Sequence, residues 1–369
     1  MIYLDHGATS FPKPVAVRRA MLDAMTNCGN PGRGGYPVAM KGAQVVYGCR
    51  KEAAELFECE PEQVVFTANC TQGLNMAIRT LFKAGDRVVI SGFEHNGVTR
   101  MLHGLGCEIL VAGRKLFDWA DTLREFGEAL DSGVTGAVFT HVSNVFGYIL
   151  PVAEMAKMCR EKGIPFLIDG AQSAGILKIS LRELGADFIA MPGHKGLLGP
   201  MGTGLLLCGR LPEPWLLGGT GSESRNQQMP DFLPDRGEAG TANVPGIAGL
   251  WAGIRQVQQM GIENIEKKEK CLALYCAKGL KKFGFQVFHG PHQSGTVSFL
   301  PGMDCEECAR KLAQQGIAVR AGLHCAPLAH ESAGTLETGT VRVSFGHDAH
   351  PSHTEELLRA LLKTGNRYL

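Results

Sequence analysis

The chain has 369 residues, of which 44% are hydrophobic and 20% charged, so it can form a core and disorder over most of its length is excluded. Its 37 basic and 36 acidic side chains leave a net charge of +1, which gives no global attraction to nucleic acid or to an anionic membrane. No apolar run approaches the roughly 20 residues that cross a bilayer, and the N-terminus lacks an export signal. We therefore expect a cytoplasmic protein whose twelve cysteines are reduced thiols.

The first two-thirds of the chain alternates short apolar runs with helix-like stretches such as 121–130 and 152–163. Continuous apolar strands that are separated by helices indicate a mostly parallel sheet with both faces covered. The loop between the last two strands is too short for a crossover helix, so one of this pair is expected to run antiparallel. The predicted strands are 63–67, 86–91, 107–112, 136–142, 165–171, 186–191 and 202–208.

The pattern changes after about residue 210. A polar, glycine-rich stretch precedes a long helical pattern over 246–283, and a small α+β arrangement follows. Its predicted elements are strands at 296–300, 316–320 and 340–345, a helix at 304–315 and a final helix from about 353. We expect an α/β protein with a large domain at 14–246 and a smaller α+β domain formed by 1–13 and 247–369.

Polar side chains follow several of the predicted strands. Asp169 ends an otherwise apolar strand, where ligands bind in open α/β sheets, although a turn Asp that caps the next helix would look the same. Gln172 can point into the same crevice. Lys195, next to His194 in a glycine-rich loop, can form a Schiff base with an aldehyde cofactor.

A phosphate site is indicated where the strand at 63–67 leads into Cys70 and Thr71 at the start of a helix. A phosphate cradle, a carboxylate and a Schiff-base lysine together fit pyridoxal 5'-phosphate. His95 and Asn144, which follow two further strands, are candidates to stack on the ring and to hydrogen-bond its hydroxyl group.

The last third of the chain supplies candidates for the substrate. Arg342 alternates with two valines on a predicted strand and can grip a carboxylate, whereas a surface salt bridge is the alternative. Cys325, a loop thiol next to His324, is a candidate nucleophile or simply one more buried cysteine.

Other metal-like patterns have simpler explanations. We interpret Cys305 and Cys308 as the start of a helix capped by Asp304 rather than as a zinc site. We interpret the histidines at 347, 350 and 353 as surface residues, and we predict no metal site.

In order along the chain, ten segments resemble the cysteine desulfurase and selenocysteine lyase family, within the class V aminotransferase group of fold type I pyridoxal-phosphate enzymes. The short spacing of 17 residues from Cys325 to Arg342 resembles the branch with a short ordered loop and an HCA motif. The chain departs from the family at His6, where Asn is usual, and at Cys70. The segments are YLDHGATS, NPGRGGY, FTANCTQGLN, EHNGV, HVSNVFG, LIDGAQSAG, GHKGLLGPMGTG, GEAGTANVPG, VRAGLHCAPL and VRVSFG.

The resemblance implies that Lys195 holds the cofactor covalently and that Asp169 pairs with its ring nitrogen. His95 would stack on the ring and help to move protons, while Asn144 and Gln172 would contact the ring oxygen.

The same resemblance places the cofactor phosphate against Thr71, His194 and the backbone around Cys70. Thr241 would reach the phosphate of a neighbouring subunit, which implies a homodimer.

Arg342 would bind the substrate carboxylate, with Arg320 as a weaker candidate and Asn144 nearby, and Cys325 would accept the sulfur. The implied reaction converts L-cysteine to L-alanine, and the sulfur then passes to an acceptor protein. The alternatives are a selenocysteine lyase, a cysteine sulfinate desulfinase, an aminotransferase-like enzyme of another specificity, or a cofactor-binding protein without turnover.

Overall fold

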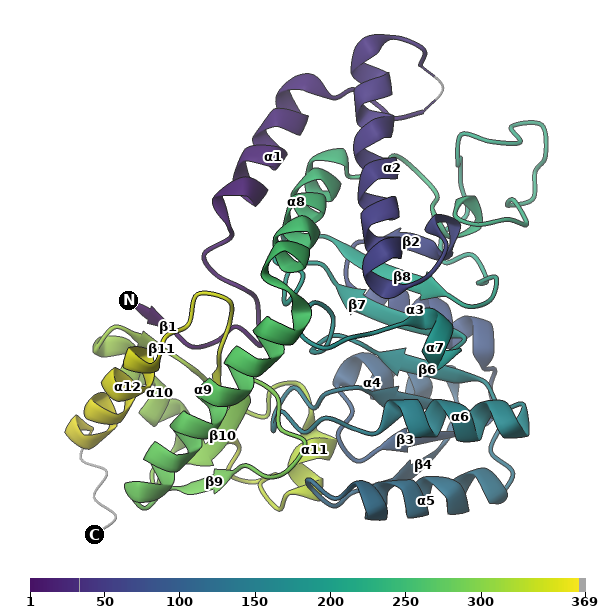
Figure 1. Cartoon of the computed structure of the whole chain (residues 1–369). Helices are drawn as coiled ribbons and strands as arrows, with labels where there is room; N and C mark the ends of the chain where they lie inside the picture. Colours follow the sequence, from purple (N-terminus) through teal and green to yellow (C-terminus); the bar gives the residue numbers. More distant parts are fainter. Residues whose placement is uncertain (33, 365–369) are drawn as a thin grey trace.

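A computed structural model describes residues 1–32 and 34–364 of the chain (Figure 1). Its helices are α1 (Val15–Asn27), α2 (Pro37–Phe57), α3 (Cys70–Leu81), α4 (Asn96–Leu105), α5 (Trp119–Asp131), α6 (Val152–Lys162), α7 (Leu181–Leu184), α8 (Val244–Met260), α9 (Ile262–Lys282), α10 (Cys305–Gln314), α11 (Pro327–Ser332) and α12 (Pro351–Lys363). Its strands are β1 (Ile2–Tyr3), β2 (Val64–Thr67), β3 (Arg87–Ser91), β4 (Glu108–Ala112), β5 (Gly136–Thr140), β6 (Phe166–Asp169), β7 (Phe188–Pro192), β8 (Gly204–Cys208), β9 (Gln286–Phe288), β10 (Thr296–Leu300), β11 (Ile317–Ala318), β12 (Arg320–Gly322) and β13 (Thr340–Ser344).

Seven of these strands form the main sheet in the order β2-β8-β7-β6-β5-β3-β4. All neighbours pair in parallel except β8, which runs antiparallel to both β2 and β7. The expected antiparallel strand is therefore confirmed, and so is the fold class of a mostly parallel mixed α/β sheet. Because β8 runs antiparallel to both of its neighbours, β2 and β7 run parallel to each other. The carboxyl ends of the five strands that precede candidate site residues, β2, β3, β5, β6 and β7, therefore lie at one edge of the sheet.

Alternate residues of these strands enter two separate cores, as the period of a strand requires. On one face, residues such as Phe139 and Ile189 pack with α2, α5, α6 and α8. On the other face, Val138 and Ala190 pack with α3 and α4. Both faces are covered, which explains why the strands read as uninterrupted apolar runs.

A second sheet, in the order β12-β13-β10-β9, packs against α9, α10 and α12 around a core of its own. The N-terminal segment joins this part of the molecule, because β1 pairs in parallel with β11. Figure 1 shows the N-terminus beside β11. The division into domains at residue 246 stays a prediction.

Two long helices, α1 and α2, were not predicted from the sequence, and they pack beside α8 (Figure 1). Glycines inside α2 hide its helical pattern, yet they serve close packing. A Cβ on Gly48 would lie 2.6 Å from the Trp251 ring, and a Cβ on Gly42 would lie 2.4 Å from the Gly29 carbonyl oxygen. Tertiary contacts therefore outweigh the low helix propensity of glycine here.

The helical pattern over 246–283 is two helices, not one. Gly261 separates α8 from α9 with a φ of 78°, a left-handed value that favours glycine. The strand expected at 316–320 is likewise divided into β11 and β12. Among the described residues, no helix is both long enough and apolar enough to cross a membrane.

Candidate active site

The carboxyl ends of the main-sheet strands gather the side chains that the sequence singled out. Asp169 is the last residue of β6, and Lys195 lies three residues beyond β7. His95 and Asn144 each follow a parallel neighbour, β3 and β5, by four residues. Because parallel strands end at a common edge, these groups share one crevice.

Lys195 lies in a tight loop that depends on close backbone packing. A Cβ on the adjacent Gly196 would lie 2.3 Å from the Ala174 carbonyl oxygen, so only glycine fits there. Burial lowers the pKa of Lys195, and the positive charges of Arg342 and Arg320 lower it further, against the opposing effect of the Asp169 carboxylate. The amine is therefore more readily deprotonated than an ordinary lysine, as a nucleophile or base requires.

Asp169 is nearly fully buried, with 2% of its surface exposed, and its carboxylate accepts a hydrogen bond from the backbone N–H of Ala171 at 2.9 Å. The Cys70 thiol also donates to Asp169 Oδ1, at 3.5 Å. Burial, together with the Asp169 charge, raises the pKa of Cys70 well above its ordinary value, so this thiol stays protonated. The structure thus places the first residue of α3 against the strand-end carboxylate.

One open hollow is lined by three of the predicted residues, Thr71, His95 and Cys325. His95 caps α4, and its Nδ1 accepts a hydrogen bond from the backbone N–H of Gly97 at 2.9 Å. The neutral ring therefore carries its proton on Nε2. Burial lowers the pKa of His95, which favours this neutral form.

Asn144, Gln172 and His194 follow the same strand ends, and backbone carbonyl oxygens hold the first two side chains. Asn144 Nδ2 donates to the His324 carbonyl oxygen at 2.8 Å, while its buried Oδ1 has no partner among the described residues. Gln172 Nε2 donates to the Gly7 carbonyl oxygen at 2.9 Å. Burial lowers the pKa of His194 to about 4, so its imidazole is neutral near pH 7.

Arg342 is 2% exposed, and its guanidinium group donates two hydrogen bonds. It donates through Nη2 to Asp5 Oδ1 at 2.7 Å and through Nη1 to the Asn144 carbonyl oxygen at 2.8 Å. Arg320, opposite Arg342 in the sheet, donates through Nε to Asp5 Oδ2 at 3.1 Å. Asp5 therefore bridges both predicted carboxylate-binding arginines, a role that the sequence analysis missed.

The loop that carries Cys325 is short and held at several points. His324 and Cys325 have φ values of 50° and 56°, a left-handed conformation that costs about 1–2 kcal/mol per residue outside glycine. The Cys325 carbonyl oxygen accepts from the backbone N–H of Asn96 at 2.7 Å, which fastens the loop to α4. The Cys325 side chain is exposed, so it is not one more buried cysteine.

His324 does not serve Cys325 as an adjacent base. Its Nε2 lies 3.2 Å from the Thr340 carbonyl oxygen, and the ring is buried. Burial and the charge of Arg342 lower its pKa to about 2, so it is a neutral packing residue beneath the loop.

Thr241 lies apart from these groups, exposed on a broad hollow that also touches Thr67 and Gln72 near the start of α3. The CxxC cysteines behave as expected: Cys305 and Cys308 are buried on α10, and Asp304 caps the helix by accepting from the Glu307 N–H.

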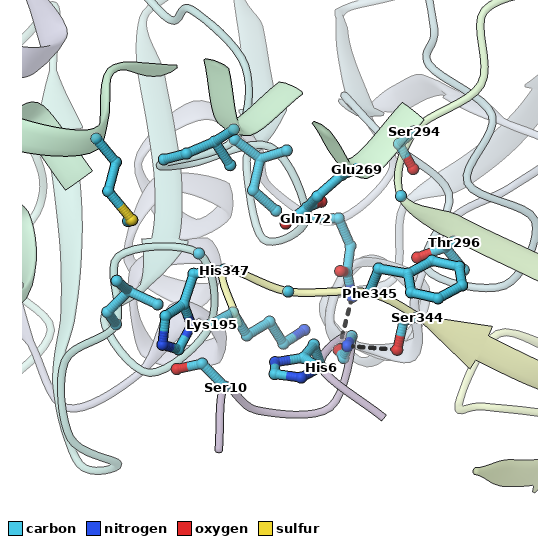
Figure 2. Close-up of a pocket in the computed structure, with 18 residues that line it drawn as sticks. His6, Ser10, Gln172, Lys195, Glu269, Ser294, Thr296, Ser344, Phe345 and His347 are labelled. Atoms are coloured by element: carbon cyan, nitrogen blue, oxygen red, sulfur yellow. Dashed lines mark hydrogen bonds between the residues drawn. The ribbon is translucent and has the colours of Figure 1, made fainter. Parts of the chain in front are cut away.

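A small cavity of about 30 Å³ lies behind Lys195 (Figure 2), with room for roughly two water molecules. His6, His347 and the buried Glu269 line it together with Lys195. The interpretation of His347 as a surface residue is wrong, because 18% of its side chain is exposed and its Nδ1 is buried. The loop in which it lies folds back over the N-terminal segment.

Glu94, next to His95, is a second buried carboxyl group that the sequence analysis missed. It accepts a hydrogen bond from the Thr140 backbone N–H at 2.8 Å, and burial raises its pKa to about 8. The sequence does contain a sign of this residue: Glu94 follows the end of β3 and directly precedes His95, the candidate ring-stacking histidine.

The chain matches the aminotransferase class-V family over residues 2–357. It is 32% identical to a probable cysteine desulfurase of Methanothermobacter thermautotrophicus, over 98% of this chain and 93% of that protein. It is 33% identical to a probable cysteine desulfurase of Pyrococcus abyssi, over 94% and 89%. The apo structure of a cysteine desulfurase from Thermococcus onnurineus NA1 superposes with a TM-score of 0.90, at 30% identity, over 98% of this chain and 94% of that one.

Proposed function

Because the chain belongs to the class-V aminotransferase family, we propose that it is a pyridoxal-phosphate-dependent cysteine desulfurase. It would convert L-cysteine to L-alanine and carry the released sulfur on Cys325 as a persulfide. The observation that supports this most directly is the placement of Lys195, Asp169 and an exposed, loop-held Cys325 at one edge of the sheet. The relatives named above carry the same activity in their names, and none of them is named for the alternatives.

The donor set fits pyridoxal phosphate. A lysine of lowered pKa suits an aldehyde, the buried carboxylate of Asp169 suits a ring nitrogen, and Asn144 Oδ1, which has no partner among the described residues, suits a ring hydroxyl. Lys195 would hold the group, with Asp169 at the ring nitrogen and His95 over the ring. Gln172 would assist Asn144. Cys70, Thr71, His194 and, from a second subunit, Thr241 would bind the phosphate.

When bound, pyridoxal phosphate supplies an electron sink that weakens the Cα–H bond of the substrate and then its Cβ–S bond. The neutral amine of Lys195 takes and returns the Cα proton, which its lowered pKa favours. His95 offers a proton on Nε2, since its Nδ1 already accepts a hydrogen bond.

Arg342 can orient the substrate carboxylate. Its contacts to Asp5 and Asn144 use two of the five guanidinium N–H groups, so three donors remain, and its Nε is buried without a partner among the described residues. Asp5 holds the side chain in place between turnovers.

Cys325 takes the sulfur through its thiolate. A new S–S bond forms as the Cβ–S bond breaks, and the protons taken up at Cα and Cβ make alanine. One L-cysteine and one enzyme thiol therefore give one alanine and one enzyme persulfide, with no external oxidant. A sulfur-acceptor protein or a reductant would then discharge Cys325.

The deciding experiment measures alanine and sulfide release from L-cysteine with pyridoxal phosphate and a thiol reductant. Equal amounts of both products are expected from the wild type. Cys325→Ala should lose the activity yet keep the visible absorption of the bound cofactor, and Lys195→Ala should lose the covalent link.

Cys271→Ala is the matched control, because this second exposed cysteine lies on α9, away from the loop. Undiminished sulfide release from Cys325→Ala would contradict the proposal. A wild type that acts on L-selenocysteine but not on L-cysteine would favour the selenocysteine lyase alternative.

We also propose a homodimer. The exposure of Thr241 in a hollow beside the start of α3 suits a residue that completes a neighbour's phosphate site. A mass measurement in solution, repeated for Thr241→Ala with cofactor titration, tests both the dimer and this role. The cytoplasmic location stays a prediction.

A further inference from the structure

Two histidines and an aspartate from opposite ends of the chain meet at the far side of the cavity behind Lys195. His6 Nε2 lies 3.4 Å from Asp348 Oδ1, and His347 Nδ1 lies 4.0 Å from the same oxygen. One ligand atom from each residue lies within 4.8 Å of the others. His347 Nδ1 is buried and has no hydrogen-bond partner in the described part of the chain.

The His6 ring is held in place before any ligand arrives. The Tyr3 ring contacts it edge-on at a centroid distance of 4.9 Å, and 5% of the His6 side chain is exposed. On its other side the ring packs on Gly346, where a Cβ would lie 2.2 Å from Nδ1. Glycine at 346 therefore leaves room for the imidazole and turns its Nε2 toward Asp348.

We propose that His6, His347 and Asp348 bind a divalent transition-metal ion of the zinc class, at a site separate from the cofactor crevice. Tetrahedral zinc holds imidazole nitrogens and carboxylate oxygens about 2.0–2.2 Å away, which places neighbouring ligand atoms roughly 3.4 Å apart. The His6–Asp348 separation already matches this value, and the His347–Asp348 separation needs to close by about 0.6 Å. Water would complete the coordination.

The three side chains differ in exposure, and the most exposed one gives the ion a route from solvent. The side chains of His6, His347 and Asp348 are 5%, 18% and 41% exposed, so the site opens toward solvent at the aspartate. Figure 2 shows His6 and His347 at the cavity that Lys195 also lines.

The ligand types set the expected selectivity, while two lysines lie close to His347. Lys13 donates to Ser10 Oγ at 2.7 Å nearby, and Lys268 donates to the His347 carbonyl oxygen at 2.8 Å. Because the site offers a single carboxylate among its three ligands, hard cations such as Ca²⁺ and Mg²⁺, which need several oxygens, are disfavoured. Imidazole ligands favour zinc, nickel and copper instead.

Metal binding would fasten the N-terminal segment to the loop after β13. Gly7, next to His6, packs on the Arg342 guanidinium, where a Cβ would lie 3.2 Å from its carbon. The ion would thus stabilise the segment that supports the carboxylate-binding arginine, without taking part in the sulfur chemistry.

The test is equilibrium dialysis of the full-length protein against zinc chloride, in a Cys271→Ser, Cys325→Ser background that removes the exposed thiols. One zinc per chain is expected. His347→Gln and Asp348→Asn should each weaken binding at least tenfold, and zinc should raise the thermal midpoint of the parent but not of these variants. His350→Gln is the matched control, because this exposed histidine of the same loop lies outside the trio.

Absorption of the cobalt-substituted protein gives an independent readout, since imidazole and carboxylate ligands produce no thiolate charge-transfer band. Zinc binding that survives both ligand substitutions, or a thiolate band, would overturn the proposal, and so would a parent that binds no zinc. Since no readout is catalytic, each of these outcomes leaves the proposed desulfurase reaction standing.

Discussion

Replacing Glu269 by Gln should flatten the pH dependence of stability, because this carboxyl group is buried and forms no ion pair within the described part of the chain. Glu269 lies on α9, is 4% exposed and faces the cavity behind Lys195. Burial raises its pKa to about 8, against a smaller opposing effect of the Lys268 charge. The start of β10 packs directly on it, since a Cβ on Gly295 would lie 2.4 Å from Glu269 Oε2.

The sign follows from proton binding. Between the unfolded pKa of about 4.5 and the folded pKa of about 8, the folded protein holds a proton on Glu269 that the unfolded chain has lost. Stability from this group is therefore complete below pH 4.5 and is lost as the pH rises toward 8. With about 1.36 kcal/mol per pKa unit, the wild type should lose about 2.5 kcal/mol through Glu269 between pH 5.5 and 7.5.

Urea titrations at pH 5.5, 6.5 and 7.5, with EDTA present, measure the free energy of unfolding. Glu269→Gln carries no titrating proton at this position. The free energy of unfolding of the variant, relative to that of the wild type, should therefore rise by about 2.5 kcal/mol from pH 5.5 to 7.5. The exposed Glu337→Gln is the control and should run parallel to the wild type. A Glu269→Gln curve that also runs parallel would show that the carboxyl group titrates normally, and would refute the reasoning.

Three further predictions concern the crevice. Arg342→Lys replaces a planar fork by a point charge, so kcat/KM for L-cysteine should fall about 10- to 100-fold, and an unchanged value would contradict its carboxylate role. Asp5→Asn leaves the buried Arg342 without its anion and should cost about 3 kcal/mol in urea unfolding. Gly196→Ala places a Cβ 2.3 Å from a backbone oxygen and should reduce cofactor loading, measured by absorption, whereas Gly104→Ala, with open space in α4, should retain it and gain up to about 1 kcal/mol.

Residues of the crevice could be predicted from the sequence where they directly follow a recognisable strand. Asp169 and Lys195 stand directly after apolar strands, and parallel strands bring such positions to one edge whatever the details of packing. The length of one loop indicated that one strand of the last pair runs antiparallel, and in the structure this strand is β8. The roles assigned to these residues still await the experiments above.

Other features depend on contacts between distant segments, which no local pattern reports. The bridge from Asp5 to Arg342 spans 337 positions and requires β1 to pair with β11. The helix α2 was hidden by glycines whose purpose is to admit Trp251 and a backbone oxygen. The local sequence around His347 is typical of a surface loop, whereas in the structure this loop packs over His6 and partly buries the histidine.

Because Asp5 pairs with Arg342, the proposed carboxylate site cannot be complete until most of the chain has been synthesised. At about 5–20 residues per second, Arg342 emerges roughly 15 to 70 s after Asp5. Until the chain has reached β11, the N-terminal segment lacks its strand partner, and Asp5 has neither Arg320 nor Arg342 as an ionic partner. A chain that ends before β13 would contain Lys195 but lack Arg342, the first candidate for binding the substrate carboxylate, so we expect incomplete products to be inactive in the proposed reaction.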